Sequence, residues 1–219
     1  MSIKALIPVR SGSLRVQNKN IKAFAGKSLL EWKVLQLLQI KELDGVIVNS
    51  NDDEMLDIAK RLGAQAVKRD EYFASNNVSM SEVYVNMAEN FDADLVFFAD
   101  ATNPLVNSQT YINGLNKYYE IQNEYDSLNS AHLLREFMIK DNKAFNYDSR
   151  KVPRSQDLPD IYALNFAFGI TRRENMIANK NVLGANPFIF EIPEDEGWDV
   201  DTPFDFDVAE YIFKQRMKI

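Results

Sequence analysis

Five short apolar segments alternate with helix-like segments along the first two thirds of the chain, and this alternation limits the possible folds most. The strand-like segments are IKALIPV, GVIVNS, QAVKR, DLVFFAD and YDSLNSAHLL, and the segments between them carry apolar residues at helical spacing. A β-α-β rhythm of this kind favours a parallel sheet with helices on both faces. We therefore expect a three-layer α/β/α fold with a mostly parallel sheet.

The rhythm breaks after residue 134. The segment FMIKDNKAFNYDSRKVPRSQDLP is polar and aromatic with weak periodicity, and we interpret residues 135–165, approximately, as an inserted arm and a candidate dimerisation element. A further strand-like run, YALNFAFGI, follows, and DTPFDFDVAEYIFKQRMK predicts a closing helix that begins at a proline. The simplest organisation is a single domain over residues 1–219 that carries this arm.

Charge and residue content exclude several classes of function. The net charge is −7, so a general affinity for nucleic acid or for an anionic membrane is not expected. The chain has no cysteine, which excludes disulfides and thiolate metal sites and favours the cytoplasm. Its one histidine, His132, excludes a multi-histidine metal site and is expected to be structural. No signal peptide or membrane span is predicted, because no apolar run approaches about 20 residues.

The stretch VRSGSLRVQNKN directly follows the first predicted strand and concentrates cations in an acidic protein. Ligands of parallel α/β sheets bind at the carboxyl ends of strands, where backbone N–H groups converge. Gly12 permits a tight turn and Ser13 offers a hydroxyl, while Arg10, Arg15 and Lys19 supply positive charge. This composition predicts a cradle for an anion, although a solvated surface loop is the alternative. The stretch is neither a Walker A motif nor a Rossmann fingerprint.

Two carboxylates near the C-terminus form a second candidate site. Asp199 and Asp201 stand two residues apart in WDVD, so on an extended segment both side chains lie on one side. Such a pair favours a bound cation, and Mg²⁺ or Mn²⁺ suits oxygen ligands. Asp205 and Asp207 fall in the first turn of the last predicted helix, where acidic residues are favoured without any ligand.

Five collinear blocks of the sequence resemble the acylneuraminate (CMP-sialic acid synthetase-like) cytidylyltransferases. IPVRSGSLRVQNKNIKAFAGKSLLEW resembles the family's I-P-A-R-x-G-S-K-x-x-x-x-K-N signature and the G-K segment after it. The other blocks are VIVNSNDDEMLDIAKRLGAQAVKRDEYFAS, ADATNPL, RSQDLPDIYALNFAFGI and WDVDTPFDFDVAE. The resemblance implies a glycosyltransferase-A-like nucleotide-binding fold, a divalent metal and a homodimer. It also implies transfer of CMP from CTP to an acidic, nonulosonate-type sugar with release of pyrophosphate, for surface glycans such as lipopolysaccharide or capsule.

The resemblance also assigns roles to individual residues. It implies that Arg10, Lys19, Asp199 and Asp201 are catalytic, with the two aspartates as metal ligands. The implied nucleotide-binding residues are Arg10, Gly12, Ser13, Arg15, Lys19, Asn20, Arg69 and Ser79. The candidate residues for the acceptor sugar are Asp100, Thr102, Asn103, Arg154, Gln156 and Asn165. Three aromatic residues of the same region are expected in the core instead, namely Tyr162, Phe166 and Phe168.

The sequence departs from the family pattern around the expected sugar pocket. Leu14 replaces the usual lysine of the loop, Asp100 replaces a glutamine, and Val106 and Ala163 stand where arginines are common. We therefore expect an acceptor that differs from sialic acid in its polar groups, with Asp100 binding either that acceptor or the metal. The alternatives are a nucleotidyltransferase for a phosphorylated or non-sugar acceptor and a non-catalytic nucleotide-binding homologue.

Overall fold

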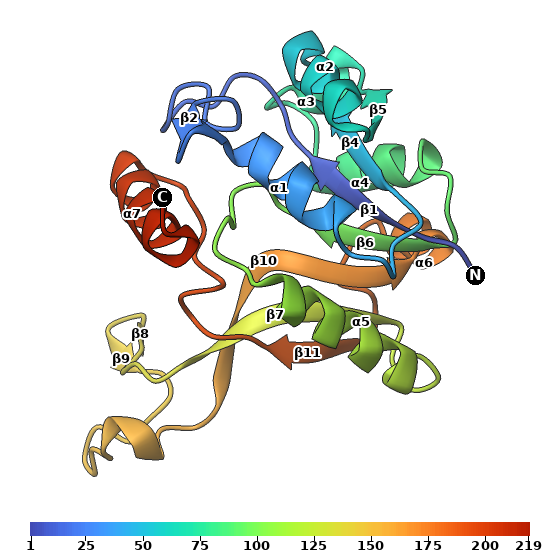
Figure 1. Cartoon of the computed structure of the whole chain (residues 1–219). Helices are drawn as coiled ribbons and strands as arrows, with labels where there is room; N and C mark the ends of the chain where they lie inside the picture. The colour runs from blue at the N-terminus through green and yellow to red at the C-terminus, as the bar shows by residue number, and fades with distance from the viewer.

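A seven-stranded mixed sheet forms the centre of the structure, a computed structural model that describes residues 1–219. The strand order is β11-β7-β10-β6-β1-β4-β5 (Figure 1). The bounds are β1 (Ile3–Pro8), β4 (Val46–Ser50), β5 (Gln65–Lys68), β6 (Leu95–Ala99), β7 (Ser127–Leu134), β10 (Ile161–Arg172) and β11 (Pro187–Glu191). Only β10 is reversed: it runs antiparallel to β6 and β7, whereas the other pairs are parallel. The expected mostly parallel α/β fold is confirmed.

Helices cover both faces of this sheet (Figure 1). One apolar core joins it to α1 (Leu29–Leu38), α2 (Asp53–Leu62) and α5 (Ser108–Ile121), and a second joins it to α4 (Met80–Glu89) and α6 (Arg173–Asn179). Alternate residues of β1 enter the two cores, with Ala5 and Ile7 in the first and Leu6 in the second. This is the period-two geometry of a strand that is buried on both faces.

A third apolar cluster brings the C-terminal helix α7 (Pro203–Met217) to the region that follows β1. Phe206 of α7 packs with Phe24 of the small hairpin β2 (Ala23–Phe24) and β3 (Lys27–Ser28), and the same cluster contains Leu105 and Val200. The segment before α7, which contains Asp199 and Asp201, therefore lies against both the loop after β1 and the loop after β6.

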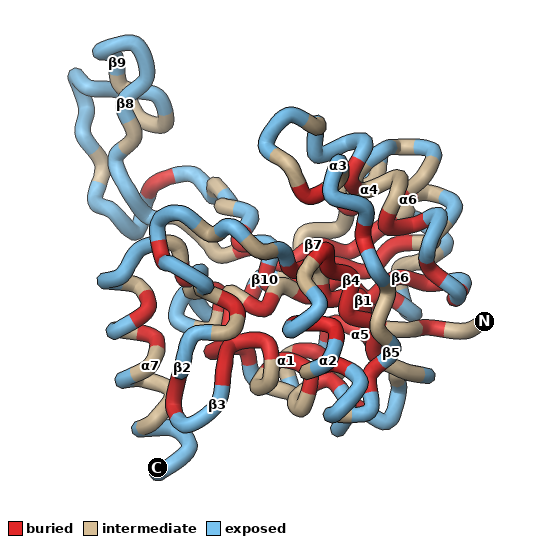
Figure 2. The backbone as a smooth tube through the Cα atoms, turned by 90° about the horizontal axis from the view of Figure 1, so that it is seen from above, coloured by how far each residue is buried: buried red, intermediate tan, exposed pale blue.

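Residues 135–160 leave the sheet between β7 and β10 and project from the body of the molecule (Figures 1 and 2). They contain the hairpin β8 (Ile139–Lys140) and β9 (Lys143–Ala144) and the short 3₁₀ helix η1 (Ser155–Asp157). Most of this segment is exposed (Figure 2). No helix in the structure is both long and apolar enough to cross a membrane.

Candidate active site

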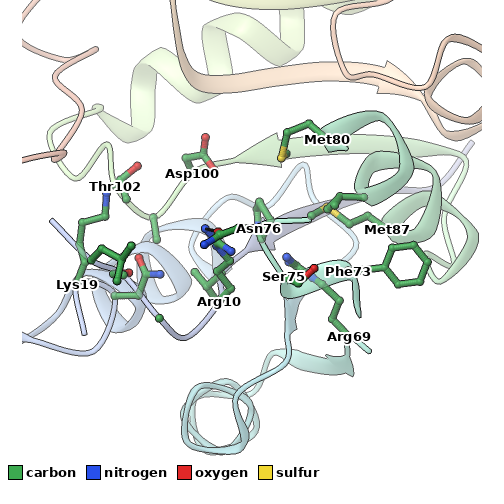
Figure 3. A pocket seen from close by; sticks show the side chains of 18 of the residues that line it. Arg10, Lys19, Arg69, Phe73, Ser75, Asn76, Met80, Met87, Asp100 and Thr102 are labelled. Carbon is green, nitrogen blue, oxygen red and sulfur yellow. Dashed lines mark hydrogen bonds between the residues drawn. The ribbon is translucent and has the colours of Figure 1, made fainter. Parts of the chain in front are cut away.

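A cleft of about 590 Å³ opens at the carboxyl ends of β1 and β6. It is lined by the loop after β1, by the segment that contains the four-residue helix α3 (Glu71–Ala74) and the start of α4, and by the residues that follow β6. Figure 3 shows Lys19 and Thr102 at one end of this cleft and Arg69 and Phe73 at the other. The predicted residues that line it are Arg10, Gly12, Ser13, Arg15, Lys19, Asn20, Arg69, Asp100, Thr102 and Asp201.

The loop after β1 owes its shape to a turn and to one polar anchor. Gly12 has φ +81°, a conformation that L side chains rarely adopt. Asn51, which follows β4, accepts a hydrogen bond from the backbone N–H of Ser11 at 3.1 Å and donates to its hydroxyl at 2.9 Å. The loop is therefore fixed to the end of the neighbouring strand. Arg10 reaches across the cleft and donates to Asn76 Oδ1 at 2.9 Å (Figure 3).

Two cations of this loop hold Asp201. Arg15 Nη2 lies 2.8 Å and Lys19 Nζ 3.4 Å from the same oxygen, Oδ1 of Asp201. Lys19 also donates to the carbonyl oxygen of Val200. The charge of Asp201 is therefore balanced within the protein, and its carboxylate ties the segment before α7 to the loop.

Asp199 lies near Asp100, and its carboxylate forms no ion pair with a lysine or arginine. Burial raises the pKa of Asp100 to about 7, and the charge of Asp199 adds to this rise, against the opposing charges of Lys33 and Lys19. The pKa of Asp199 is also raised, chiefly by the protein packed around its carboxyl group, although the side chain remains open to solvent on its outer side. Neither carboxylate forms a salt bridge. Asp199 raises the pKa of Asp100, and the charge of Asp201 raises the pKa of Asp199. A cation bound among these carboxylates would relieve their repulsion.

The donor set fits a divalent metal that takes only part of its coordination from the protein. No group of three or more histidine or acidic side chains converges on one point. Mg²⁺ commonly binds through one or two carboxylates together with substrate phosphates. The two unpaired carboxylates of Asp100 and Asp199 beside a cationic loop match that pattern better than Asp199 and Asp201, because Asp201 already has two cationic partners.

Arg69 and Asn20 are buried polar residues in the wall of the cleft. Arg69 is 4% exposed and donates to the side chain and carbonyl of Asn49, at 2.6 and 2.8 Å. Burial lowers its pKa to about 10, and the charge of Arg10 acts in the same direction. Asn20 is 6% exposed, and its Oδ1 has no hydrogen-bond partner in the protein. An unpaired acceptor at such a site is costly unless a ligand satisfies it.

Ser79 does not line the cleft. Its hydroxyl accepts from the backbone N–H of Glu82, and its own backbone N–H donates to the Glu82 carboxylate, both at 3.3 Å, which forms a capping box at the start of α4. The hydroxyl also donates to this carboxylate at 2.7 Å. Ser75 and Asn76 line the cleft from the preceding segment instead. The S-x-x-E spacing of residues 79–82 is a recognised helix-start signal and could have indicated this role from the sequence.

Asn103 and Asn165 lie behind the cleft rather than in its lining. Asn103 Nδ2 donates to the carbonyl of Gly197 at 3.0 Å. Asn165 Oδ1 accepts from the Ser130 hydroxyl at 2.7 Å and from the backbone N–H of Ala167 at 3.2 Å, at the irregularity where the pairing of β10 with β7 shifts register. Both asparagines thus support backbone that borders the site.

Two predicted residues lie on the projecting arm, outside the cleft of their own chain. Arg154 pairs with Asp157 at 2.7 Å, and Gln156 is exposed in η1.

The core prediction for the β10 aromatics is correct for Phe168, which is 1% exposed. It is wrong for Tyr162 and Phe166, which are 40% and 41% exposed, because β10 leaves the body of the sheet before residue 167 and its outward face has no covering layer.

Lys33 is a further polar residue near the site, and no role was predicted for it. It is 1% exposed in α1, behind the loop that follows Asp100. One signal could have found it: the lysine interrupts the apolar stripe of the predicted helix, between Leu30 and Leu37, where a core residue is expected.

The sequence profile of the cytidylyltransferase family matches residues 4–217. The chain belongs to this family. The family typically uses a divalent metal, and the cytidylyltransferase resemblance of the five sequence blocks is confirmed. The protein is thus a CTP-dependent cytidylyltransferase.

Individual relatives cover nearly the whole cytidylyltransferase chain. Post-translational flagellin modification protein B of Campylobacter coli is 26% identical over 98% of this chain and 96% of its own length. Pseudaminic acid cytidylyltransferase of Campylobacter jejuni is 28% identical over 95% of each chain. N-acylneuraminate cytidylyltransferase B of Danio rerio is 28% identical over 94% of this chain, which corresponds to 50% of that protein.

Solved structures support the fold. A CMP:2-keto-3-deoxy-manno-octonic acid synthetase complexed with CTP superimposes with a TM-score of 0.73 at 17% identity, covering 99% of this chain and 100% of that one. The 4-diphosphocytidyl-2C-methyl-D-erythritol synthase of Anaerococcus prevotii gives a TM-score of 0.71 at 13% identity, covering 97% and 96%. At these identities the likeness concerns the architecture alone.

Proposed function

We propose that the protein transfers CMP from CTP to a nonulosonic acid of the pseudaminic or sialic type and releases pyrophosphate. The observation that carries this proposal is the cleft in which the cations of the loop after β1 face the carboxylate of Asp100. Asp199 does not line this cleft, but it lies near enough to raise the pKa of Asp100. The names of the relatives support the acceptor class. Because CTP is the donor, the reaction belongs in the cytoplasm, where the product supplies surface glycan synthesis.

The loop after β1 binds the triphosphate in this proposal. Arg10, Arg15 and Lys19 offset its charge, and the turn at Gly12 and Ser13 lets backbone N–H groups approach the phosphate oxygens. The acceptor hydroxyl attacks the α-phosphorus and releases its proton to solvent, a new P–O bond forms, and the bond to the pyrophosphate oxygen breaks. Positioning and electrostatic stabilisation supply most of the catalysis in phosphoryl-type transfers.

Asp100 and Asp199 are the proposed ligands of Mg²⁺ or Mn²⁺, in place of the Asp199–Asp201 pair expected from the sequence. The bound metal would offset charge on the reacting phosphates. Asp201 has a separate role: its ion pairs with Arg15 and Lys19 hold these cations at the edge of the cleft.

The cytosine is recognised at the other end of the cleft. Arg69 lines this end, and Asn76 lines the cleft beside Arg10. Asn20, the neighbour of Lys19 in the chain, offers its unpaired Oδ1 to a hydroxyl group of the nucleotide at the opposite end. Ser79 supports this wall indirectly by starting α4. The acceptor then lies towards Thr102 and Asp100, and Arg154 and Gln156 approach it only from the arm of a second subunit in a homodimer.

An acceptor panel tests this proposal. Pyrophosphate release is measured with CTP, Mg²⁺ and either pseudaminic acid, a legionaminic acid derivative, N-acetylneuraminate, 2-keto-3-deoxy-octonate or a phosphorylated polyol. We expect the highest kcat/KM with a nine-carbon acid whose amide decoration differs from that of N-acetylneuraminate. Preferred turnover of the phosphorylated polyol, or no release with any acid, would contradict the proposal, and efficient turnover of N-acetylneuraminate would contradict the expected difference in decoration.

A further inference from the structure

Lys33 is a lysine at a core position. It lies on the face of α1 that also buries Leu30, Val34 and Leu37, and only 1% of its surface is exposed. Lysine is almost never fully buried unless its ammonium group has partners, because the loss of hydration is costly. A buried lysine in an otherwise apolar stripe therefore points to a specific task for the ammonium group.

The partners of Lys33 belong to the elements that follow Asp100. Its Nζ donates to the carbonyl oxygen of Asn103 at 2.9 Å and to the hydroxyl of Tyr111 in α5, and it lies 5.0 Å from the centre of the Tyr111 ring. Burial lowers the pKa of Lys33 to about 7, and the negative charge of Asp100 opposes this shift. The ammonium thus approaches the cleft from behind without lining it.

The loop held by Lys33 is joined to the segment that contains Asp199. The side chain of Asn103 donates to the carbonyl of Gly197 at 3.0 Å, and the backbone N–H of Val200 donates to the carbonyl of Thr102 at 2.9 Å. These two hydrogen bonds fix the backbone before and after Asp199, at Gly197 and at Val200. One buried contact therefore fixes the loop after Asp100 and, through it, the backbone of Asp199.

We propose that Lys33 is a positioning residue that sets the separation of Asp100 and Asp199 and thereby the affinity of the site for its divalent metal. The inference rests on the proposed function in one respect, namely that these two carboxylates hold the metal. A purely structural role is a poor explanation, since an apolar side chain of similar length would fill the same space without desolvating a charge.

Calorimetry with and without Mg²⁺ tests this role. The quantity compared is the gain in CTP affinity on addition of Mg²⁺. It is measured in wild type, in Lys33→Met and in the control Lys117→Met, which removes a partly exposed charge from α5. Loss of a residue that orients metal ligands typically weakens metal binding by about 10- to 100-fold. We therefore expect the Mg²⁺-dependent gain in CTP affinity to be about tenfold or more smaller in Lys33→Met than in wild type. The CTP affinity of Lys33→Met in EDTA should equal that of wild type. The control Lys117→Met should show the wild-type gain.

Chemical rescue separates charge from volume. Because the chain has no cysteine, Lys33→Cys can be alkylated uniquely in denaturant, with 2-bromoethylamine to restore an ammonium or with 1-bromopropane to add the same volume without charge, and then refolded. We expect only the aminoethylated protein to recover the Mg²⁺-dependent gain, while both products refold.

Three results would overturn the inference: a wild-type gain in Lys33→Met, equal recovery with both alkylating agents, or refolding of the aminoethylated chain alone, which would make Lys33 a requirement of the whole fold. Wild-type CTP binding that does not respond to Mg²⁺ is a different outcome. It would remove the metal site of the proposed function and the role of Lys33 with it.

Discussion

Asp100 lies in the candidate site, and its ionised carboxylate lowers the free energy of unfolding. Asp100 directly follows β6 and lines the cleft. Burial of its carboxyl group, with the nearby charge of Asp199, raises its pKa to about 7. An unfolded aspartate titrates near 4. Between these values the native protein binds a proton at this site that the unfolded chain does not, so the free energy of unfolding falls as pH rises through this window.

Replacement of Asp100 by asparagine removes that cost. In metal-free buffer at pH 8 we expect Asp100→Asn to unfold at a higher temperature than wild type by several degrees, since about 1 kcal/mol corresponds to roughly 2–4 °C in a domain of this size. The difference should shrink towards pH 4, where Asp100 is protonated in the wild-type native state. Thermal unfolding at both pH values measures it, and a constant difference would contradict the assigned pKa.

At the scale of elements, two nearby polar residues at the start of α4 have different roles. Ser79 forms the capping box of α4, whereas Asn76, three residues earlier, lines the cleft and accepts from Arg10. The two polar residues are close in sequence but differ in what their side chains contact.

We expect Ser79→Ala to reduce the free energy of unfolding by about 1 kcal/mol, the usual cost of a lost helix cap, with CTP affinity unchanged. Asn76→Ala should instead raise the Kd for CTP severalfold at nearly unchanged stability. Urea unfolding and calorimetry of both variants test this contrast, and weaker CTP binding in Ser79→Ala would assign that residue to the site after all.

The sequence pattern was sufficient to predict β1, β6, α5 and α7. The two strands are short continuous apolar runs, and the two helices bury residues at helical spacing. The elements α3, α6, β11 and the β2–β3 hairpin were not predicted. They are short, and β11 is a strand only because it pairs with β7 at the edge of the sheet. The insertion of β10 between β6 and β7 also depends on tertiary pairing that chain order does not reveal.

The candidate site was predictable to a similar extent. The loop after β1 is readable because arginine, glycine and serine gather where no core residue is expected. The pairing of Asp199 with Asp100 was not readable, because it depends on packing of the segment before α7 against the loop after β6. Asn76 and Lys33 depend equally on long-range contacts.

At the scale of the whole molecule, the projecting arm exposes apolar side chains and predicted site residues that have no partner within a single chain. Its apolar side chains Ile139, Phe145 and Val152 are 61%, 56% and 62% exposed, and Phe137 is 43% exposed. Several exposed apolar side chains on one projecting segment favour an interaction site there. The same arm contains Arg154 and Gln156, which have no cleft of their own chain within reach.

We expect the protein to be a homodimer joined through the arm, with a mass in light scattering of twice 25.2 kDa. The double variant Ile139→Asp/Phe145→Asp should be monomeric, because two charges would be buried in the interface. It should retain CTP binding but lose at least tenfold in kcat/KM for the acceptor. A monomeric wild type, or a dimer that persists in the variant, would contradict this arrangement.

The most direct test of the central claim is calorimetric binding of CTP, UTP, ATP and GTP, with and without Mg²⁺, to wild type, Asp199→Asn and Asp201→Asn. We expect selective binding of CTP by wild type, loss of the Mg²⁺-dependent gain in Asp199→Asn, and weaker CTP binding with the gain retained in Asp201→Asn, because Asp201 holds Arg15 and Lys19. Equal binding of all four nucleotides, or an undiminished response to Mg²⁺ in Asp199→Asn, would contradict a CTP and metal site in this cleft.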